Sequence, residues 1–169
     1  MKHKAFIALG SNLAGDLNSP ASQVIRGFQA ISLMPKTALI KASSLYKTAP
    51  IGYADEQLKT VTDFINAVVQ ISTDLSALQL LDAILAIENA AGRSRPFANA
   101  PRELDCDLLL YDDTEMHTQK LTLPHPRMHE RAFVLLPLSE ISPELTIKNH
   151  GNVVKLADKF KNQGIQKLA

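Results

Sequence analysis

Two aspartates stand two residues apart in an apolar stretch near the middle of the chain. Asp105 and Asp107 lie within residues 104–111, which read Leu-Asp-Cys-Asp-Leu-Leu-Leu-Tyr. Side chains of a β-strand alternate between its two faces, so a strand here would put both carboxylates on one face, about 6.6 to 6.8 Å apart. At that distance they can hold divalent cations together but cannot share a proton. The spacing therefore favours a metal site over an aspartic-protease pair.

Three arginines come just before this strand, at Arg93, Arg95 and Arg102. Guanidinium groups grip phosphates through paired hydrogen bonds. Magnesium keeps several of its waters and is bound by few carboxylates together with substrate phosphates. The residue types thus predict a magnesium–polyphosphate site. A plainer alternative is that the acids end a solvated edge strand and the arginines solvate a loop.

Several separated motifs resemble the signatures of one enzyme family, the 6-hydroxymethyl-7,8-dihydropterin pyrophosphokinases of folate biosynthesis. The first is Arg93-x-Arg95 followed by Pro101-Arg102-x-Leu104-Asp105-x-Asp107, and the second is Leu123-Pro124-His125-Pro126-x-Met128. The likeness extends from Ala8-Leu9-Gly10-Ser11-Asn12 to Ile141-Ser142-Pro143-Glu144-Leu145. It therefore covers nearly the whole chain.

The resemblance implies an ATP-dependent pyrophosphokinase that transfers the β,γ-pyrophosphoryl group of ATP to the pterin hydroxymethyl group and releases AMP. It implies two Mg²⁺ ions on Asp105 and Asp107, with Arg93 and Arg102 stabilising the charge of the transferred and leaving groups. It also implies a pterin site and an ATP site. The pterin residues would be Thr48, Ala49, Pro50, Ile51, Phe64, Asn66 and Phe133, and the ATP residues Glu88, Arg95, Leu108, Lys120, Thr122, His125 and Arg131.

The elements that must position these residues follow the order β-α-β-β-α-β. Strands are expected at residues 4–9, 39–46, 64–72 and 104–111. One helix is predicted from Pro20, with Ser19 as its N-cap, towards Pro35, and another from the capping box Ser76-x-x-Gln79 to Gly92. This order is typical of an α+β, ferredoxin-like antiparallel sheet with both helices on one face. Under the family resemblance further helices cover the other face, making a three-layer α/β/α sandwich.

Strand alternation assigns side chains to the two faces of that sheet. Phe64, Asn66, Asp105 and Asp107 are expected on the ligand face, while Ile65, Ala67, Cys106 and Leu108 are expected to pack on the helices. By the same alternation Leu110 shares the face of Cys106 and Leu108, and Leu109 and Tyr111 share the face of the two aspartates. Downstream, we expect an extended piece at 121–123, a helical turn near Met128, a segment bounded by Pro137 and Pro143, and a helix over 153–161.

Two side chains have more than one interpretation. Glu88, in the last turn of the second helix, opposes the helix dipole, so it either has a role or is solvated and pairs with a loop arginine. His125 and His129 have the spacing of a helical metal pair. However, HExxH is absent, and Pro124 and Pro126 make a helix there unfavourable.

Composition limits the possible functions. The chain has 169 residues, 46% apolar and 21% charged, with 18 Lys and Arg against 17 Asp and Glu. This predicts one domain over 1–169 without a general affinity for nucleic acid or membranes. We expect Cys106, the single cysteine, to be a small buried hydrophobe, and we expect a cytoplasmic location because signal-peptide and membrane-span patterns are absent. We also expect a monomer.

Two other functional classes use a similar pattern. RNA-recognition domains share the β-α-β-β-α-β order but carry aromatic and basic residues on their open strands. Here the corresponding strand carries Asp105 and Asp107, which would repel phosphate without a metal. A catalytically silent relative that binds a pterin or nucleotide is the third interpretation.

Overall fold

The computed structural model describes residues 2–12, 19–48, 63–91, 104–160 and 165–168. Its main sheet is antiparallel, with the strand order β10-β3-β4-β1-β5 and with β2 also pairing with β4. These strands are β1 (His3–Ser11), β2 (Thr37–Ala42), β3 (Tyr46–Thr48), β4 (Phe64–Thr73), β5 (Asp105–Tyr111) and β10 (Gln166–Lys167). Strand β5 therefore lies at one edge of the sheet.

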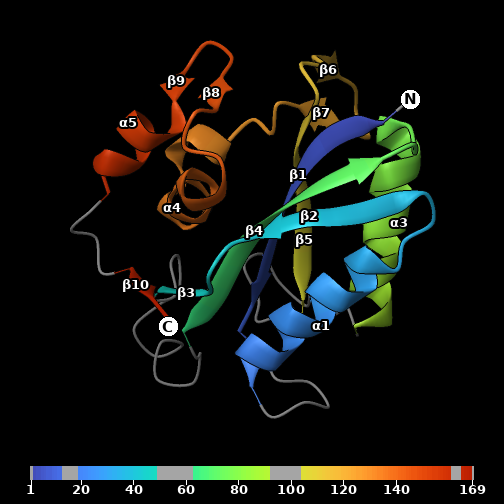
Figure 1. Ribbon diagram of the computed structural model, residues 1–169, viewed down its shortest axis with the longest axis horizontal. Helices are drawn as coiled ribbons and strands as arrows, with labels where there is room; N and C mark the ends of the chain where they lie inside the picture. The colour runs from blue at the N-terminus through green and yellow to red at the C-terminus, as the bar shows by residue number, and fades with distance from the viewer. Residues whose placement is uncertain (1, 13–18, 49–62, 92–103, 161–164, 169) are drawn as a thin grey trace.

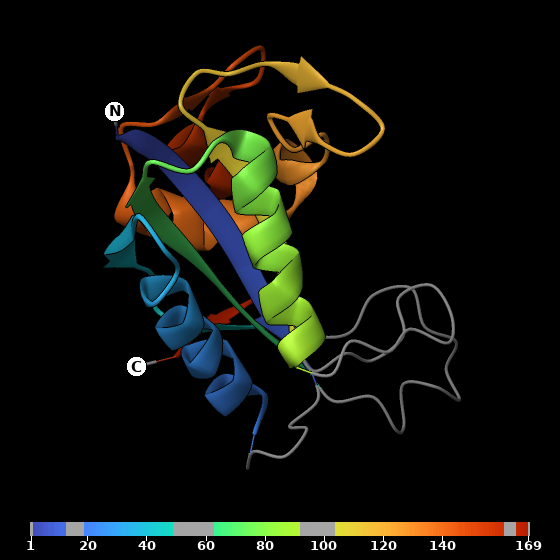
Figure 2. The ribbon, with the colours of Figure 1, turned by 90° about the vertical axis from the view of Figure 1, so that its right-hand side faces the viewer.

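Helices cover both faces of this sheet. Figure 1 shows α1 (Pro20–Ser32) and α3 (Ala77–Ala90) on one side, and α4 (Ala132–Ile141) and α5 (Val153–Asp158) on the other. Figure 2 shows α1 and α3 on the near side of the strands. Short elements complete the described fold: β6 (Met116–His117), β7 (Thr122–Leu123), the 3-10 turn η1 (Met128–Glu130), β8 (Thr146–Ile147) and β9 (Gly151–Asn152).

Two apolar cores correspond to the two faces. The first packs Ile7, Ala67 and Cys106 of the sheet against α1 and α3, and the second packs Phe6, Val68 and Leu109 against α4 and α5. Alternation along β1 and β4 produces both cores from the same strands. The ferredoxin-like arrangement and the three layers are thus confirmed. The strands that an RNA-recognition domain leaves open are covered here.

The starts of the two long helices follow the sequence signals. The Ser19 side chain accepts a hydrogen bond from the Ser22 N–H, and Pro20 occupies the first turn of α1. Ser76 and Gln79 form the reciprocal capping box of α3. Both predicted N-termini are confirmed, because the first N–H groups of each helix find local acceptors.

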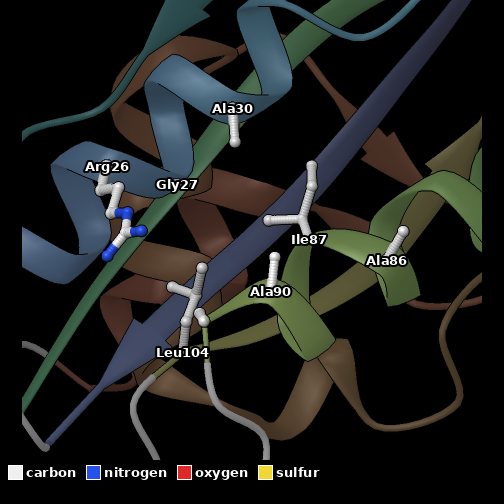
Figure 3. A pocket seen from close by; sticks show the side chains of 8 residues that line it. Arg26, Gly27, Ala30, Ala86, Ile87, Ala90 and Leu104 are labelled. Atoms are coloured by element: carbon white, nitrogen blue, oxygen red, sulfur yellow. The ribbon is translucent and has the colours of Figure 1, made fainter. Parts of the chain in front are cut away.

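A groove of about 220 Å³ lies between α1 and the C-terminal end of α3 (Figure 3). Gly27 lies at its base, and a Cβ there would lie 2.6 Å from Leu9 Cδ2, so the buried Leu9 side chain would have to move. The absent side chain lets α1 pack closely on β1. The groove is lined by Arg26, Gly27, Ala30, Ala86, Ile87, Ala90, Ala91 and Leu104.

The expected strand over 39–46 is two strands. Strands β2 and β3 both pair with β4, and residues 43–45 between them leave the regular ladder. The Ser43 N–H donates to Val68 O, but the Val68 N–H donates to the Ser43 side chain instead of to a backbone carbonyl. A side-chain acceptor thus replaces a ladder bond and interrupts the strand.

The strand over 104–111 carries a β-bulge that the alternation pattern did not predict. The pairing with β1 shifts between Phe6, opposite Leu110, and Ile7, opposite Leu108. Leu109 is therefore an extra residue, and Leu109 and Leu110 both pack in the second core while Tyr111 joins the first. The faces expected for Leu110 and Tyr111 were wrong because a bulge reverses the alternation beyond it.

Two further expectations concern the C-terminal part. Pro137 lies inside α4 instead of bounding a segment, and the last helix ends at Asp158 instead of 161. Strand β10, which the sequence did not predict, pairs with β3. None of the helices in the described part of the chain is long and apolar enough to cross a membrane.

Candidate active site

A cleft of about 530 Å³ runs along the outer edge of β5. Helix α3, strand β5, and the chain just before, within and after β7 form its walls, together with Arg131 at the start of α4. The lining residues are Leu81, Leu85, Glu88, Asp105, Cys106, Asp107, Leu108, Gln119, Lys120, Leu121, Thr122, His125, Pro126 and Arg131. Acidic and basic side chains thus line the same cleft.

Asp105 and Asp107 share one face of β5, as predicted. They pair with Gly10 and Ala8 of β1, whereas Cys106 between them is buried in the first core. Both aspartates are partly exposed. Burial, together with the Glu88, Asp105 and Asp107 carboxylates, holds the pKa of the Cys106 thiol well above its ordinary value, so it stays protonated. Cys106 is the buried small hydrophobe that the sequence predicted.

Glu88 is buried and bonded, not solvated. Its side chain, in the last turn of α3, is 3% exposed and accepts a hydrogen bond from the Cys106 backbone N–H at 3.3 Å. This N–H points outward from β5, which has no further strand beside it among the described residues. Glu88 thereby connects the end of α3 to the residue between the two aspartates. Of the two interpretations of Glu88, the solvated one is wrong, because α3 packs directly on β5 and buries the side chain.

His125 is held as a neutral imidazole. Burial, with repulsion from Arg131 and Arg127, lowers the pKa of His125 to about 4, although Asp105 acts in the opposite direction. The Arg127 backbone N–H donates to Nδ1 at 3.2 Å, so Nδ1 is the acceptor and Nε2 carries the proton. The ring therefore offers one N–H donor. His125 and His129 do not share a helix, since η1 begins at Met128.

The lowered pKa of His125 predicts a pH-dependent stability. Between about pH 6.5 and 4 the unfolded chain binds a proton at His125 that the folded chain does not, so stability falls as the pH falls through this window. At pH 5 we expect the wild type to take up about one proton more on unfolding than His125→Gln. Urea unfolding at several pH values measures this difference. Parallel stability curves for the two proteins would contradict it.

Asn66 is fixed by two neighbours. Its Nδ2 donates to the Thr48 side chain at 3.2 Å, and it lies over Gly10, where a Cβ would be 2.7 Å from Asn66 Oδ1. An isolated glycine in a strand often marks such a close approach. The carboxamide is 7% exposed, and its orientation is thus set by β3 on one side and β1 below.

Asn66 and Asp105 belong to one row across the sheet. Asn66 pairs with Gly10, and Gly10 pairs with Asp105, so the two side chains share a face and are separated by about 9 to 10 Å, two strand spacings. Phe133, in the first turn of α4, packs beside this face, and the Arg131 guanidinium lies 5.6 Å from its ring centroid. The side chains expected to bind the pterin and those expected to bind ATP and magnesium therefore lie near one another.

The structure brings most of the expected ATP residues into the cleft. Glu88, Leu108, Lys120, Thr122, His125 and Arg131 line it together with the aspartate pair. Lys120 also forms an ion pair with Asp82 at 3.0 Å on the surface of α3. Thr48, Phe64 and Asn66 lie together where β3 pairs with β4. Ala49, Pro50, Ile51, Arg93, Arg95 and Arg102 lie outside the described residues.

Some cleft residues had no signal in the sequence. Leu81, Leu85 and Gln119 line the cleft but belong to no motif. Leu81 shares helical spacing with Leu80, Ile84 and Ile87, which fits its packing against the first core. Gly10 belongs to the motif over residues 8–12. An isolated glycine within a strand was the sequence signal from which its close contact with another segment, here Asn66, could have been predicted.

Comparisons with known proteins agree with this geometry. The family model described as 7,8-dihydro-6-hydroxymethylpterin-pyrophosphokinase matches residues 6–143. The 2-amino-4-hydroxy-6-hydroxymethyldihydropteridine pyrophosphokinase of Haemophilus influenzae is 41% identical over 164 residues, covering 97% of each chain. The Pseudomonas aeruginosa protein of the same name is 36% identical over 168 residues, covering 99% of this chain and 98% of its own.

A solved structure supports the fold alone. The crystal structure of Plasmodium falciparum HPPK-DHPS with pteroate matches with a TM-score of 0.72 and 16% identity, over 95% of this chain and 42% of that one. This chain thus spans less than half of that longer protein. From the full-length relatives and the matching family model, the chain belongs to the 7,8-dihydro-6-hydroxymethylpterin-pyrophosphokinase family.

Proposed function

We propose that this chain transfers the pyrophosphoryl group of ATP to the hydroxymethyl group of 6-hydroxymethyl-7,8-dihydropterin, a step of folate biosynthesis. The products are AMP and the dihydropterin pyrophosphate. The observation that carries the proposal is the row from Asn66 through Gly10 to Asp105, which joins a pterin half-site to a polyphosphate half-site on one face of the sheet.

The aspartate pair suits magnesium. In the described part of the chain no group of three or more His, Cys, Asp or Glu side chains could enclose a metal ion. Two carboxylates on one strand face instead fit an ion that keeps waters and substrate oxygens as its other ligands. We assign Asp105 and Asp107 to two Mg²⁺ ions. When bound, magnesium neutralises the negative charge of the polyphosphate.

The nucleotide half-site is assigned to the cleft. Lys120, His125 and Arg131 are donors to phosphate oxygens, His125 through its Nε2–H. Glu88 and Thr122 are polar contacts of the nucleotide, and Leu108 packs against it. Arg93, Arg95 and Arg102, predicted from the sequence, are assigned to the transferred and leaving groups. The pterin hydroxyl oxygen attacks the β-phosphorus and loses its proton to solvent, the bond from that phosphorus to the oxygen bridging the α- and β-phosphates breaks, and AMP leaves with that oxygen.

The pterin half-site is assigned to β3, β4 and the start of α4. The Asn66 carboxamide hydrogen-bonds the amide edge of the pterin, because its Oδ1 and second Nδ2–H remain after the bond to Thr48. Phe64 and Phe133 enclose the ring from two sides. A flat heterocycle between aromatic rings, with few fixed polar contacts, is bound selectively. The backbone of Ala49, Pro50 and Ile51 completes the assignment.

We also propose a domain organisation, an oligomeric state and a cellular location for the protein. Residues 1–169 form one domain, the protein acts as a monomer in the cytoplasm, and it needs neither a nucleic acid nor a membrane. Light scattering of the purified chain measures its mass in solution and tests the monomer directly.

Product analysis tests the reaction. The protein is incubated with ATP, magnesium and 6-hydroxymethyl-7,8-dihydropterin, and nucleotides are separated by chromatography. We expect one AMP for each pterin consumed. Formation of ADP, or nucleotide turnover that does not depend on the pterin, would reject the proposed reaction.

Replacement of Gly10 by alanine tests the pterin half-site. The new Cβ would lie 2.7 Å from Asn66 Oδ1, so the end of the Asn66 side chain must move. This atom ends a flexible side chain, so we expect little change in stability. We expect the pterin KM to rise about tenfold, the effect of about 1.4 kcal/mol, while the ATP KM is retained.

Thr48 supplies the control for this prediction. Thr48→Ser keeps the hydroxyl that accepts from Asn66 and should retain a normal pterin KM, whereas Thr48→Val should resemble Gly10→Ala. A normal pterin KM in Gly10→Ala would remove Asn66 from the pterin site.

A further inference from the structure

One carboxylate joins helix α4 to the segment that leads into β3. Glu140 Oε1 accepts hydrogen bonds from the Ser44 N–H at 3.0 Å and the Tyr46 hydroxyl at 2.8 Å, and Oε2 accepts from the Ser44 hydroxyl at 2.8 Å. Lys167 Nζ of β10 lies 3.7 Å from Oε2. Both carboxylate oxygens of Glu140 are thus bound by polar groups of β3, of the segment just before it, and of the neighbouring strand β10.

The electrostatics match a permanently charged anchor. Burial raises the pKa of Glu140, but the Ser44 and Tyr46 hydrogen bonds outweigh it and lower the pKa below its ordinary value. Burial, followed by the hydrogen bond to Glu140, raises the pKa of Tyr46, so its hydroxyl remains a donor. Hydrogen bonds to an ionised acceptor are the stronger kind.

Glu140 lies between two walls of the pterin half-site. Strand β3 continues from Tyr46 to Thr48, whose side chain holds the Asn66 carboxamide. Helix α4 carries Phe133 seven residues before Glu140, which is two helical turns and therefore the same helix face. The carboxylate thus fixes α4, with Phe133, relative to β3, with Thr48.

A second bond at the same helix end supports this role. Lys41 Nζ donates to the Ile141 carbonyl at 3.3 Å, so residues before and after the break in the strand both contact the end of α4. On the outer side, β10 pairs with β3, and the Leu168 N–H donates to Leu45 O at 2.8 Å. Strand β3 is only three residues long, so these contacts supply much of its support.

We propose that Glu140 is a positioning residue for the pterin: it touches no substrate, and it sets the spacing between Phe133 and the Thr48–Asn66 pair. The proposal rests on the pterin half-site assigned above. Removing the carboxylate breaks the hydrogen bonds that hold β3 to α4. We expect this to weaken pterin binding and not ATP binding, because the nucleotide cleft lies along β5 at the other edge of the sheet.

Kinetics of Glu140 variants test this role. For Glu140→Ala we expect the pterin KM to rise about tenfold, with kcat and the ATP KM within about twofold of the wild type. Glu140→Gln keeps one acceptor oxygen for Ser44 and Tyr46, and it should recover most of the pterin affinity. Glu144→Ala is the matched control, because that exposed carboxylate is bonded to Ser142 and not to β3.

A second readout separates this inference from the proposed reaction. The side-chain amide signals of Asn66 in NMR spectra report its bond to Thr48 without any turnover. We expect Glu140→Ala and Tyr46→Phe to shift these signals and speed their hydrogen exchange, and Glu144→Ala to leave them unchanged. Shifted signals in a protein that forms no AMP would uphold the positioning role while rejecting the reaction. An unchanged pterin KM together with unchanged Asn66 signals would overturn the role of Glu140.

Discussion

Replacing Asp107 by alanine is expected to slow AMP formation by about a hundred- to several-thousand-fold, a loss of roughly 3 to 5 kcal/mol of transition-state stabilisation. Asp107 shares its strand face with Asp105 at the cleft, and one carboxylate alone cannot hold two divalent ions. The rate is measured with saturating ATP and pterin over a series of magnesium concentrations.

An aspartate outside the cleft provides the control. Asp113 follows β5 in an exposed turn, so Asp113→Ala should retain a rate within about twofold of the wild type. Asp107→Asn keeps the side-chain volume but not the charge, and it should be as slow as Asp107→Ala. Near-normal turnover by Asp107→Ala would remove the aspartate from the reaction.

Replacing Leu135 by alanine is expected to lower the free energy of unfolding by about 2 to 5 kcal/mol. Leu135 is 0% exposed and is part of the second core, between α4 and the sheet. Its truncation leaves a cavity that the surrounding side chains fill only in part. Urea denaturation at neutral pH measures the loss.

The exposed end of α1 supplies the matched substitution. Leu33 is 83% exposed, so Leu33→Ala should change stability by no more than about 0.5 kcal/mol. Equal effects of the two substitutions would mean that α4 and α5 do not form a packed layer on the sheet.

Much of the fold could be predicted from local patterns. Alternation along residues 64–72 assigned Ile65, Ala67 and Asn66 to the correct faces, because β4 is regular over this length. Along 104–111 the same reasoning held up to Leu108 and then failed at the bulge, which depends on pairing with β1 and not on the local residues. The C-terminal strand, Gln166–Lys167, is too short and polar to show any period.

The residues of the candidate site also fall into those that the sequence predicted and those that it could not. Asp105 and Asp107 were predictable from spacing, and the family resemblance added six more cleft residues, Glu88, Leu108, Lys120, Thr122, His125 and Arg131. Burial of Glu88 could not be read from its position in α3, since it depends on how that helix docks on β5. The role of Glu140 was equally hidden, because its partners lie about a hundred residues earlier.

The edge position of β5 has a consequence for solubility. Exposed edges of sheets can pair with other chains and cause aggregation. On β5, however, the Cys106 N–H is bonded to Glu88, and Leu109 O accepts from the His125 backbone N–H at 2.9 Å. These bonds leave fewer groups for another strand to pair with. The chain thus protects the edge that carries its aspartates from intermolecular β-sheet growth, while their side chains still face the cleft.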